Sequence, residues 1–180
     1  VHSEDGPLAA YLTKRLLAEG KRSVNWLPAA RPPTTESLSI TMVTDYAEAT
    51  GCSVYIVHLA SKRALETASA ARARGVNVFV ETRPVYLYLD RSRYDLPGVE
   101  GNKYASWPPL RTPEDQAALW NGLASGTIQT YGTDHVPWPS AMMLAPDIDF
   151  SQIPGGASNV ETSVGMLYAE GVAKGRISLR

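Results

Sequence analysis

The chain has 180 residues with a formal net charge of -1, and 44% of its residues are hydrophobic. These values fit one ordinary soluble domain: no basic excess suggests nucleic acid, and no apolar run approaches the roughly 20 residues of a membrane helix. The single cysteine, Cys52, cannot form an internal disulfide, which favours a cytoplasmic setting. Its place at the entry of an apolar run predicts a core residue rather than a nucleophile.

The first third of the chain predicts two helices. One is expected over residues 8–19, and the second starts from a cap at Thr34 or Thr35. Residues 21–33, which include three prolines, are expected to be irregular. The apolar residues of the second helix follow helical spacing as far as Gly51: Leu38, Met42, Tyr46 and Ala49.

The middle of the chain predicts a strand, a helix and a second strand. Residues 53–59 form an almost continuously apolar run, typical of a strand covered on both faces. Ser61 caps a helix that continues to Ala73, and a new strand is expected over residues 76–82.

The last part of the chain predicts two long loops between regular elements. The apolar residues 85–89 are interpreted as a prolongation of the preceding strand, and residues 90–111 contain only turn signals. A helix is expected from Thr112 to Gly126, because a proline and two acidic residues follow the threonine. A strand over residues 127–131 follows, and after a proline-rich loop a final helix is expected over residues 161–173.

Alternating strands and helices indicate right-handed β-α-β units and a parallel sheet. Three strands are too few to close a barrel of eight, which typically takes about 250 residues. The pattern therefore fits either a small open sheet or the second half of an eight-stranded barrel.

Three residues of metal-ligand type lie at or near strand ends. His58 ends one strand, Asp134 follows another, and His2 opens the chain. Imidazole and carboxylate groups on neighbouring strand ends suit zinc, manganese or iron, and the three side chains are expected to converge. The spacing equally allows a packed His58, a turn-capping Asp134 and an inconsequential His2. Glu4 and Asp5 are interpreted as solvated residues.

Several blocks carry a resemblance to a known family. VHSEDG at residues 1–6 resembles the HAEN-type segment of the hydantoinase and dihydropyrimidinase branch of the amidohydrolases. RPPTTES and CSVYIVHLAS are similar to the sixth-strand region of that family, and NVFVETRPVYLYLD to its next strand. KYASWPPLR, GTDHVPW and DFSQIPGGASNVET resemble the remaining blocks, in the same order as in the family. The resemblance covers essentially the whole chain.

The resemblance implies an α/β fold, namely the second half of a (β/α)8 TIM-like metallo-dependent hydrolase barrel. It also implies hydrolysis of a small cyclic amide, such as a hydantoin or dihydropyrimidine, by a hydroxide that bridges two divalent ions, with zinc favoured and manganese possible. His2 and His58 would bind one ion. Asp134 would bind the other and would carry the proton from the attacking water to the ring nitrogen. A cytoplasmic homotetramer is implied as well.

Two groups of family ligands have no counterpart: a His-x-His pair on the first strand and a carboxylated lysine on the fourth. Residues 1–180 are therefore expected to be a partial barrel domain, from the tip of the fifth strand to beyond the eighth, without its N-terminal half.

The substrate loops also depart from the family pattern. Trp107 stands where hydantoinases usually have a serine, with Ser106 one place earlier. Gly155 stands where many have an asparagine, and Asn159 is shifted. These four residues are expected to bind substrate, in a pocket more apolar than usual. A non-catalytic dihydropyrimidinase-like scaffold protein and an inactive fragment remain as alternatives.

Overall fold

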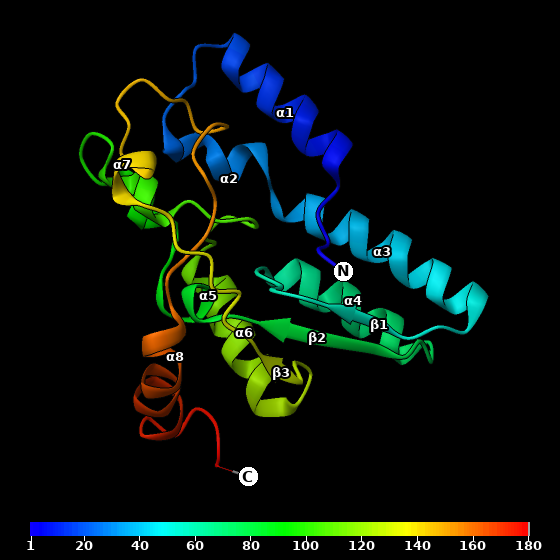
Figure 1. The fold of residues 1–180 in the computed structure, drawn as a ribbon. Coiled ribbons are helices and arrows are strands. Elements are labelled where there is room, and N and C mark those ends of the chain that lie inside the picture. Colours follow the sequence, from blue (N-terminus) through cyan, green and yellow to red (C-terminus); the bar gives the residue numbers. More distant parts are fainter. Residues whose placement is uncertain (180) are drawn as a thin grey trace.

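A three-stranded parallel sheet lies at the centre of the computed structural model, which describes residues 1–179. Its strands are β1 (Val54–Ile56), β2 (Val78–Thr82) and β3 (Thr130–Tyr131), in the spatial order β1-β2-β3. Val54 pairs with Val78, and Glu81 pairs with Thr130. The sheet is the predicted one, with each strand shorter than its apolar run (Figure 1).

Helices connect the strands and cover one face of the sheet, while the other face is open (Figure 1). The α-helices are α1 (Gly6–Ala18), α2 (Leu27–Ala30), α3 (Pro33–Thr50), α4 (Lys62–Ala73), α5 (Pro84–Tyr88), α6 (Pro113–Ser125), α7 (Ser140–Met143) and α8 (Val160–Met166). Three short 3-10 helices, η1 (Val24–Trp26), η2 (Arg91–Asp95) and η3 (Glu100–Tyr104), lie in the loops, and a π-helical segment, η4 (Leu167–Val172), continues α8.

Side-chain caps fix where several helices begin. Asp5 accepts a hydrogen bond from the backbone N–H of Leu8 at 2.7 Å, and Ser61 caps α4 in the same way. Thr112 and Asp115 form a reciprocal capping box at the start of α6. The starts at Ser61 and Thr112 are the predicted ones, whereas Asp5, which was expected to be a solvated residue, caps α1.

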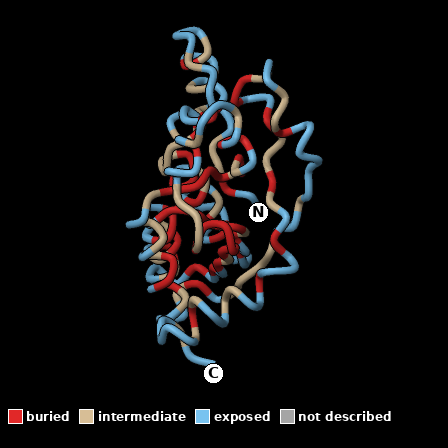
Figure 2. Tube along the Cα trace, turned by 90° about the vertical axis from the view of Figure 1, so that its left-hand side faces the viewer, coloured by how far each residue is buried: buried red, intermediate tan, exposed pale blue. Residues whose placement is uncertain are grey.

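The two faces of the sheet differ in burial. The side chains of Val78 and Val80 are buried against the helical layer, in which α4 packs on β2, α3 and α6. On the opposite face Tyr55 and Phe79 are 40% and 41% exposed. Figure 2 shows buried residues concentrated in the middle of the molecule. The face with Tyr55 and Phe79 is therefore the one that a closed barrel would turn inward.

Two of the sequence-based interpretations are wrong about regular structure. Residues 84–88 form helix α5, not a continued strand, because Pro84 at the first helical position fixes a helical φ and the carbonyl of Leu87 accepts a hydrogen bond from Trp120 Nε1 at 3.2 Å. Residues 21–33 contain η1 and α2. These elements are short, and short apolar runs do not distinguish helix from strand or loop.

Helix α3 also differs from expectation in its cap and its faces. It begins at Pro33 with Pro32 as the N-cap residue, so neither Thr34 nor Thr35 caps it. The residues at the predicted apolar spacing, Leu38, Met42 and Tyr46, are exposed, and the packed face carries Thr35, Glu36, Ile40, Thr44 and Ala47. The spacing of apolar residues shows that they share one face of the helix, but it does not show whether that face packs against the sheet.

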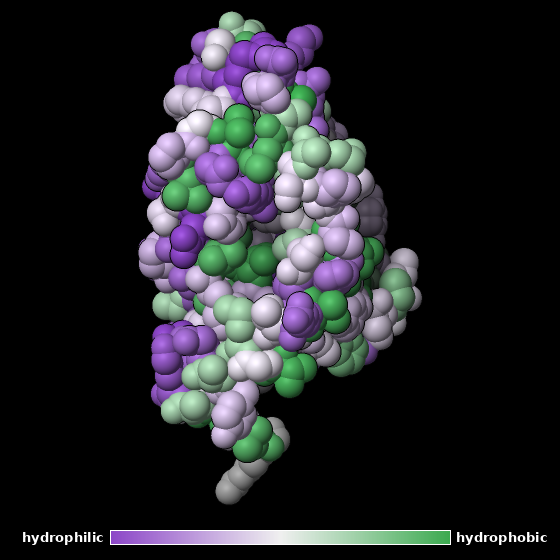
Figure 3. Space-filling model, turned by 60° about the vertical axis from the view of Figure 1, so that its left-hand side comes forward, coloured by the Kyte–Doolittle hydropathy of each residue, from purple (hydrophilic) through white to green (hydrophobic). Residues whose placement is uncertain are grey.

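The surface is mixed in polarity. Cys52 is exposed, not in the core, because it lies in the turn between α3 and β1. Figure 3 shows small groups of apolar side chains separated by polar ones, with a hollow near the middle of that face. No helix within residues 1–179 is long and apolar enough to span a membrane.

Candidate metal centre and active site

His2 and His58 meet at the carboxyl end of β1. The chain start runs beside this strand, since the Val1 amino group donates to Tyr55 O at 2.6 Å and the N–H of Val57 donates to Val1 O at 3.2 Å. This pairing brings His2 Nδ1 within 2.9 Å of His58 Nε2, with the rings edge to face. Two residues 56 positions apart thus present facing imidazole nitrogens.

The backbone at His58 has an unusual conformation. Its φ is +42°, and Asp134, at +43°, is the other non-glycine residue with positive φ in the described part of the chain. Such a conformation costs free energy and occurs preferentially at functional sites. Both residues were candidates from their strand-end positions, and both have this strained backbone.

Burial keeps the His58 imidazole neutral. Desolvation, assisted by the nearby charges of His2 and Arg83, lowers the pKa of His58 to about 4. Within residues 1–179 its Nδ1 is buried and has no hydrogen-bond partner. A neutral imidazole is the form that binds a metal ion.

Glu4 orients the second imidazole. Its carboxylate lies 3.1 Å from His2 Nε2 and accepts a hydrogen bond from Arg31 Nη1 at 2.7 Å, and the side chain is 1% exposed. Burial alone would raise the pKa of Glu4, but the hydrogen bond with His2 and the charge of Arg31 outweigh it and lower the pKa. The expectation that Glu4 is solvated is therefore wrong. A carboxylate behind a histidine is the usual support for a metal-binding imidazole.

Glu81, on the neighbouring strand, holds the backbone of His58 in place. Its Oε1 accepts the backbone N–H of His58 at 3.3 Å, and its Oε2 accepts the Tyr55 hydroxyl at 2.6 Å. Sequence reasoning missed this residue. The alternation in β2 was a usable signal, because the buried Val80 places Glu81 on the opposite, inner face beside the end of β1.

Asp134 is held by an arginine and not by the imidazoles. Arg83, which follows β2 and is 1% exposed, donates from Nη1 to Asp134 Oδ2. Across residues 1–179, no three histidine, cysteine, aspartate or glutamate side chains gather closely enough to hold an ion. The structure thus brings His2 and His58 together and places Asp134 beside Arg83.

His135 is directed at helix α8. Its Nδ1 accepts hydrogen bonds from the backbone N–H groups of Asn159 and Val160 at 3.1 and 3.2 Å. The residue also forms a parallel bridge with Ala157. His135 therefore fixes the loop before α8, whereas Asp134 next to it faces Arg83.

The four residues predicted to bind substrate differ in their contacts. The Ser106 hydroxyl donates to Pro108 O at 2.7 Å and is engaged within its own loop. Asn159 is 5% exposed, and neither Oδ1 nor Nδ2 has a partner within the described chain. Such an amide in a buried position requires a ligand or water. Trp107 and Gly155 are in direct contact.

The indole of Trp107 occupies the space beside Gly155. A Cβ built on Gly155 would overlap the indole ring, and Gly155 has no positive φ, so the obstacle is the tryptophan alone. The guanidinium of Arg31 stacks on the indole, 4.3 Å from the ring centroid. Arg31 also binds Glu4, so the indole is linked to His2 through two side chains.

We expect Gly155→Ala to destabilise the protein by about 1–3 kcal/mol, because the new methyl group forces the indole out of its position. The same change in a Trp107→Ser background is expected to cost much less, because the space is then free. Chemical denaturation of the two single variants and the double variant measures the difference. Equal costs in both backgrounds would show that Trp107 and Gly155 do not compete for this space.

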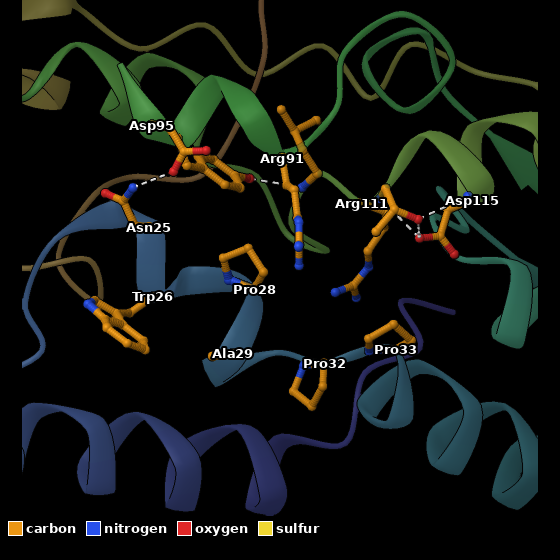
Figure 4. Close-up of a pocket in the computed structure, with 13 residues that line it drawn as sticks. Asn25, Trp26, Pro28, Ala29, Pro32, Pro33, Arg91, Asp95, Arg111 and Asp115 are labelled. Carbon is orange, nitrogen blue, oxygen red and sulfur yellow. Dashed lines mark hydrogen bonds between the residues drawn. The ribbon is translucent and has the colours of Figure 1, made fainter. Parts of the chain in front are cut away.

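Another cavity lies away from these residues. It measures about 540 Å³ and is formed by the prolines between η1 and α3 together with Arg91, Arg111 and Asp115 (Figure 4). A cavity of about 310 Å³ lies nearer the substrate loops and includes Ser106, Val136 and Gly156 in its lining. The lining of this smaller cavity includes Val136, two residues after Asp134, and Gly156, the neighbour of Gly155.

The sequence and the structure of this chain are both similar to those of known proteins. No family model matches the chain. It is 38% identical over 180 residues to a D-hydantoinase from Geobacillus stearothermophilus, covering 99% of this chain and 38% of that protein. The structure matches a D-hydantoinase (dihydropyrimidinase) from Thermus sp. with a TM-score of 0.96 at 38% identity, over 99% of this chain and 39% of that one. A dihydropyrimidinase from Brevibacillus agri gives the same values. The chain thus spans about two fifths of the length of these relatives.

Proposed function

We propose that this chain, which belongs to the hydantoinase and dihydropyrimidinase branch of the amidohydrolases, forms part of a metal-dependent hydrolase that opens small cyclic amides. The bond broken is a C–N bond other than a peptide bond. The observation that carries the proposal is the facing pair His2 and His58, at the end of a parallel strand where such folds build their sites. The corresponding longer protein would complete the barrel around the open sheet face.

The imidazole pair fits a divalent ion. The two nitrogens face each other, His58 is neutral, and Glu4 supports His2 from behind. A divalent ion of the zinc or manganese type, bound there, would polarise a carbonyl and lower the pKa of water from 15.7 to about 7 in favourable sites. The resemblance implies two such ions, but Asp134 already has Arg83 as its cationic partner.

The side chains of this chain then have distinct tasks. Asp134 is the proton carrier: it takes a proton from the attacking water and delivers it to the leaving ring nitrogen. His2 and His58 hold the ion, and the free amide of Asn159 binds the polar edge of the ring. Trp107, held by Arg31 and Gly155, forms an apolar wall of the pocket. We also propose a cytoplasmic homotetramer, which gel filtration of the intact protein tests.

We expect the full-length protein to hydrolyse a 5-aryl hydantoin faster than dihydrouracil, because Trp107 replaces a polar side chain with an aromatic surface. Activity should disappear on exhaustive chelation and return with zinc or manganese. Ring opening is followed by the ultraviolet absorbance of each substrate. A preference for dihydrouracil would contradict the role of Trp107. A folded protein without bound metal and without activity would instead favour a scaffold function.

A further inference from the structure

Arg83 is a buried cation within the candidate site. The side chain is 1% exposed, Nη1 binds Asp134, and Nη2 donates to the Tyr86 hydroxyl at 2.8 Å. The guanidinium also lies over the Tyr86 ring, 4.6 Å from its centroid. Tyr86 is anchored in turn, since its hydroxyl donates to Pro108 O at 2.7 Å. The position of Arg83 is therefore fixed by packing as well as by charge.

The carboxylate of Asp134, which a second metal ion would need as a ligand, is already paired with Arg83. A guanidinium stays charged at any pH at which proteins are folded. An ion on Asp134 Oδ2 would displace Arg83 from the carboxylate and leave a buried guanidinium without an anionic partner, which is strongly unfavourable. It would also place two like charges side by side. Neither obstacle exists at His2 and His58, whose nitrogens face each other next to the carboxylate of Glu4.

We propose that Arg83 takes the place of a second metal ion, so that the protein binds a single divalent ion, at His2 and His58. The inference rests on the proposed function and reduces the number of metal ions it requires from two to one. Arg83 neutralises Asp134 and holds its Oδ2 in place. Arg83 is accordingly a positioning residue for Asp134.

The test counts zinc ions per full-length chain by atomic emission after equilibration with excess zinc and gel filtration. Wild type and Arg83→Lys, which keeps the charge, are expected to hold one ion. Arg83→Met, which keeps the aliphatic stem without the charge, is expected to hold two. The added ion should be lost again in Arg83→Met combined with Asp134→Asn, which locates it at Asp134.

Arg83→Met is expected to fold, because Asp134 is 39% exposed and can be hydrated, and because Tyr86 keeps its hydrogen bond to Pro108 O. Circular dichroism checks this. Arg22→Met is the matched control: it removes another arginine–aspartate pair, with Asp149, and should leave one ion. Two ions in the wild type, or one ion in a folded Arg83→Met variant, would overturn the inference. No bound ion in the wild type would refute the proposed function instead.

Discussion

A His58→Ala variant of the full-length protein is expected to lose the metal ion proposed to bind at His2 and His58, and to fall in kcat/KM for cyclic amides by about a thousandfold or more. A bound metal supplies several kcal/mol of transition-state stabilisation, and losing roughly 4 kcal/mol corresponds to about 10³ in rate. His58 contributes one of the two facing imidazoles, and its backbone is held in a strained conformation by Glu81. Metal analysis and steady-state kinetics measure the two losses.

The matched control is His135→Ala, which removes an imidazole from the residue next to Asp134. His135 binds the backbone before α8 and neither imidazole of the pair, so this variant should keep its metal. A His58→Ala protein that retains a full complement of metal would show that the ion is held elsewhere. Loss of metal from both variants would point to a disturbed fold.

The starts of α4 and α6 and the alternation of strands and helices were readable from local chemistry. Ser61 and Thr112 cap helices through side chains a few residues from the groups they bind, so their signal lies within one short window. The exposed stripe of α3 was not readable, because the spacing of Leu38, Met42 and Tyr46 is the same whichever way the helix turns. Helix α5 was missed because its short apolar run also fits a strand.

The candidate site was only partly predictable, because some of its residues have a local sequence signal and others do not. His58 and Asp134 were found because parallel strands end at one edge of a sheet. The pairing of Arg83 with Asp134 joins residues 51 positions apart, and that of His2 with His58 joins residues 56 apart. Such partners are decided by the register of the sheet and by the packing of α5, which no local pattern encodes. His2 was a candidate from its residue type alone, and the family resemblance gave it a role as a ligand of the same ion as His58.

A buried ion pair outside the candidate site, between Glu36 and Arg111, joins segments that are far apart in the chain. Arg111 Nη2 donates to Glu36 Oε2 at 2.6 Å, and the side chains of Arg111 and Glu36 are 4% and 2% exposed. Glu36 Oε1 accepts the backbone N–H of Ala60 at 2.9 Å, and Arg111 Nη1 donates to Arg31 O at 2.6 Å. The pair therefore ties α3 to the turn after β1 and to the loop before α6.

A Glu36→Ala substitution is expected to lower the free energy of unfolding by about 3–5 kcal/mol, because Arg111 is left buried without its counter-charge and the N–H of Ala60 loses its acceptor. Glu36→Gln should cost less, since an amide oxygen can still accept from Ala60. Urea denaturation of the purified protein measures both. The control is Glu114→Ala, which breaks an exposed pair with Lys62 and should cost far less, because solvent screens that pair. If Glu36→Ala were no more damaging than Glu114→Ala, the buried pair would not be what joins these segments, and apolar packing around Ile40 and Leu59 would hold them together unaided.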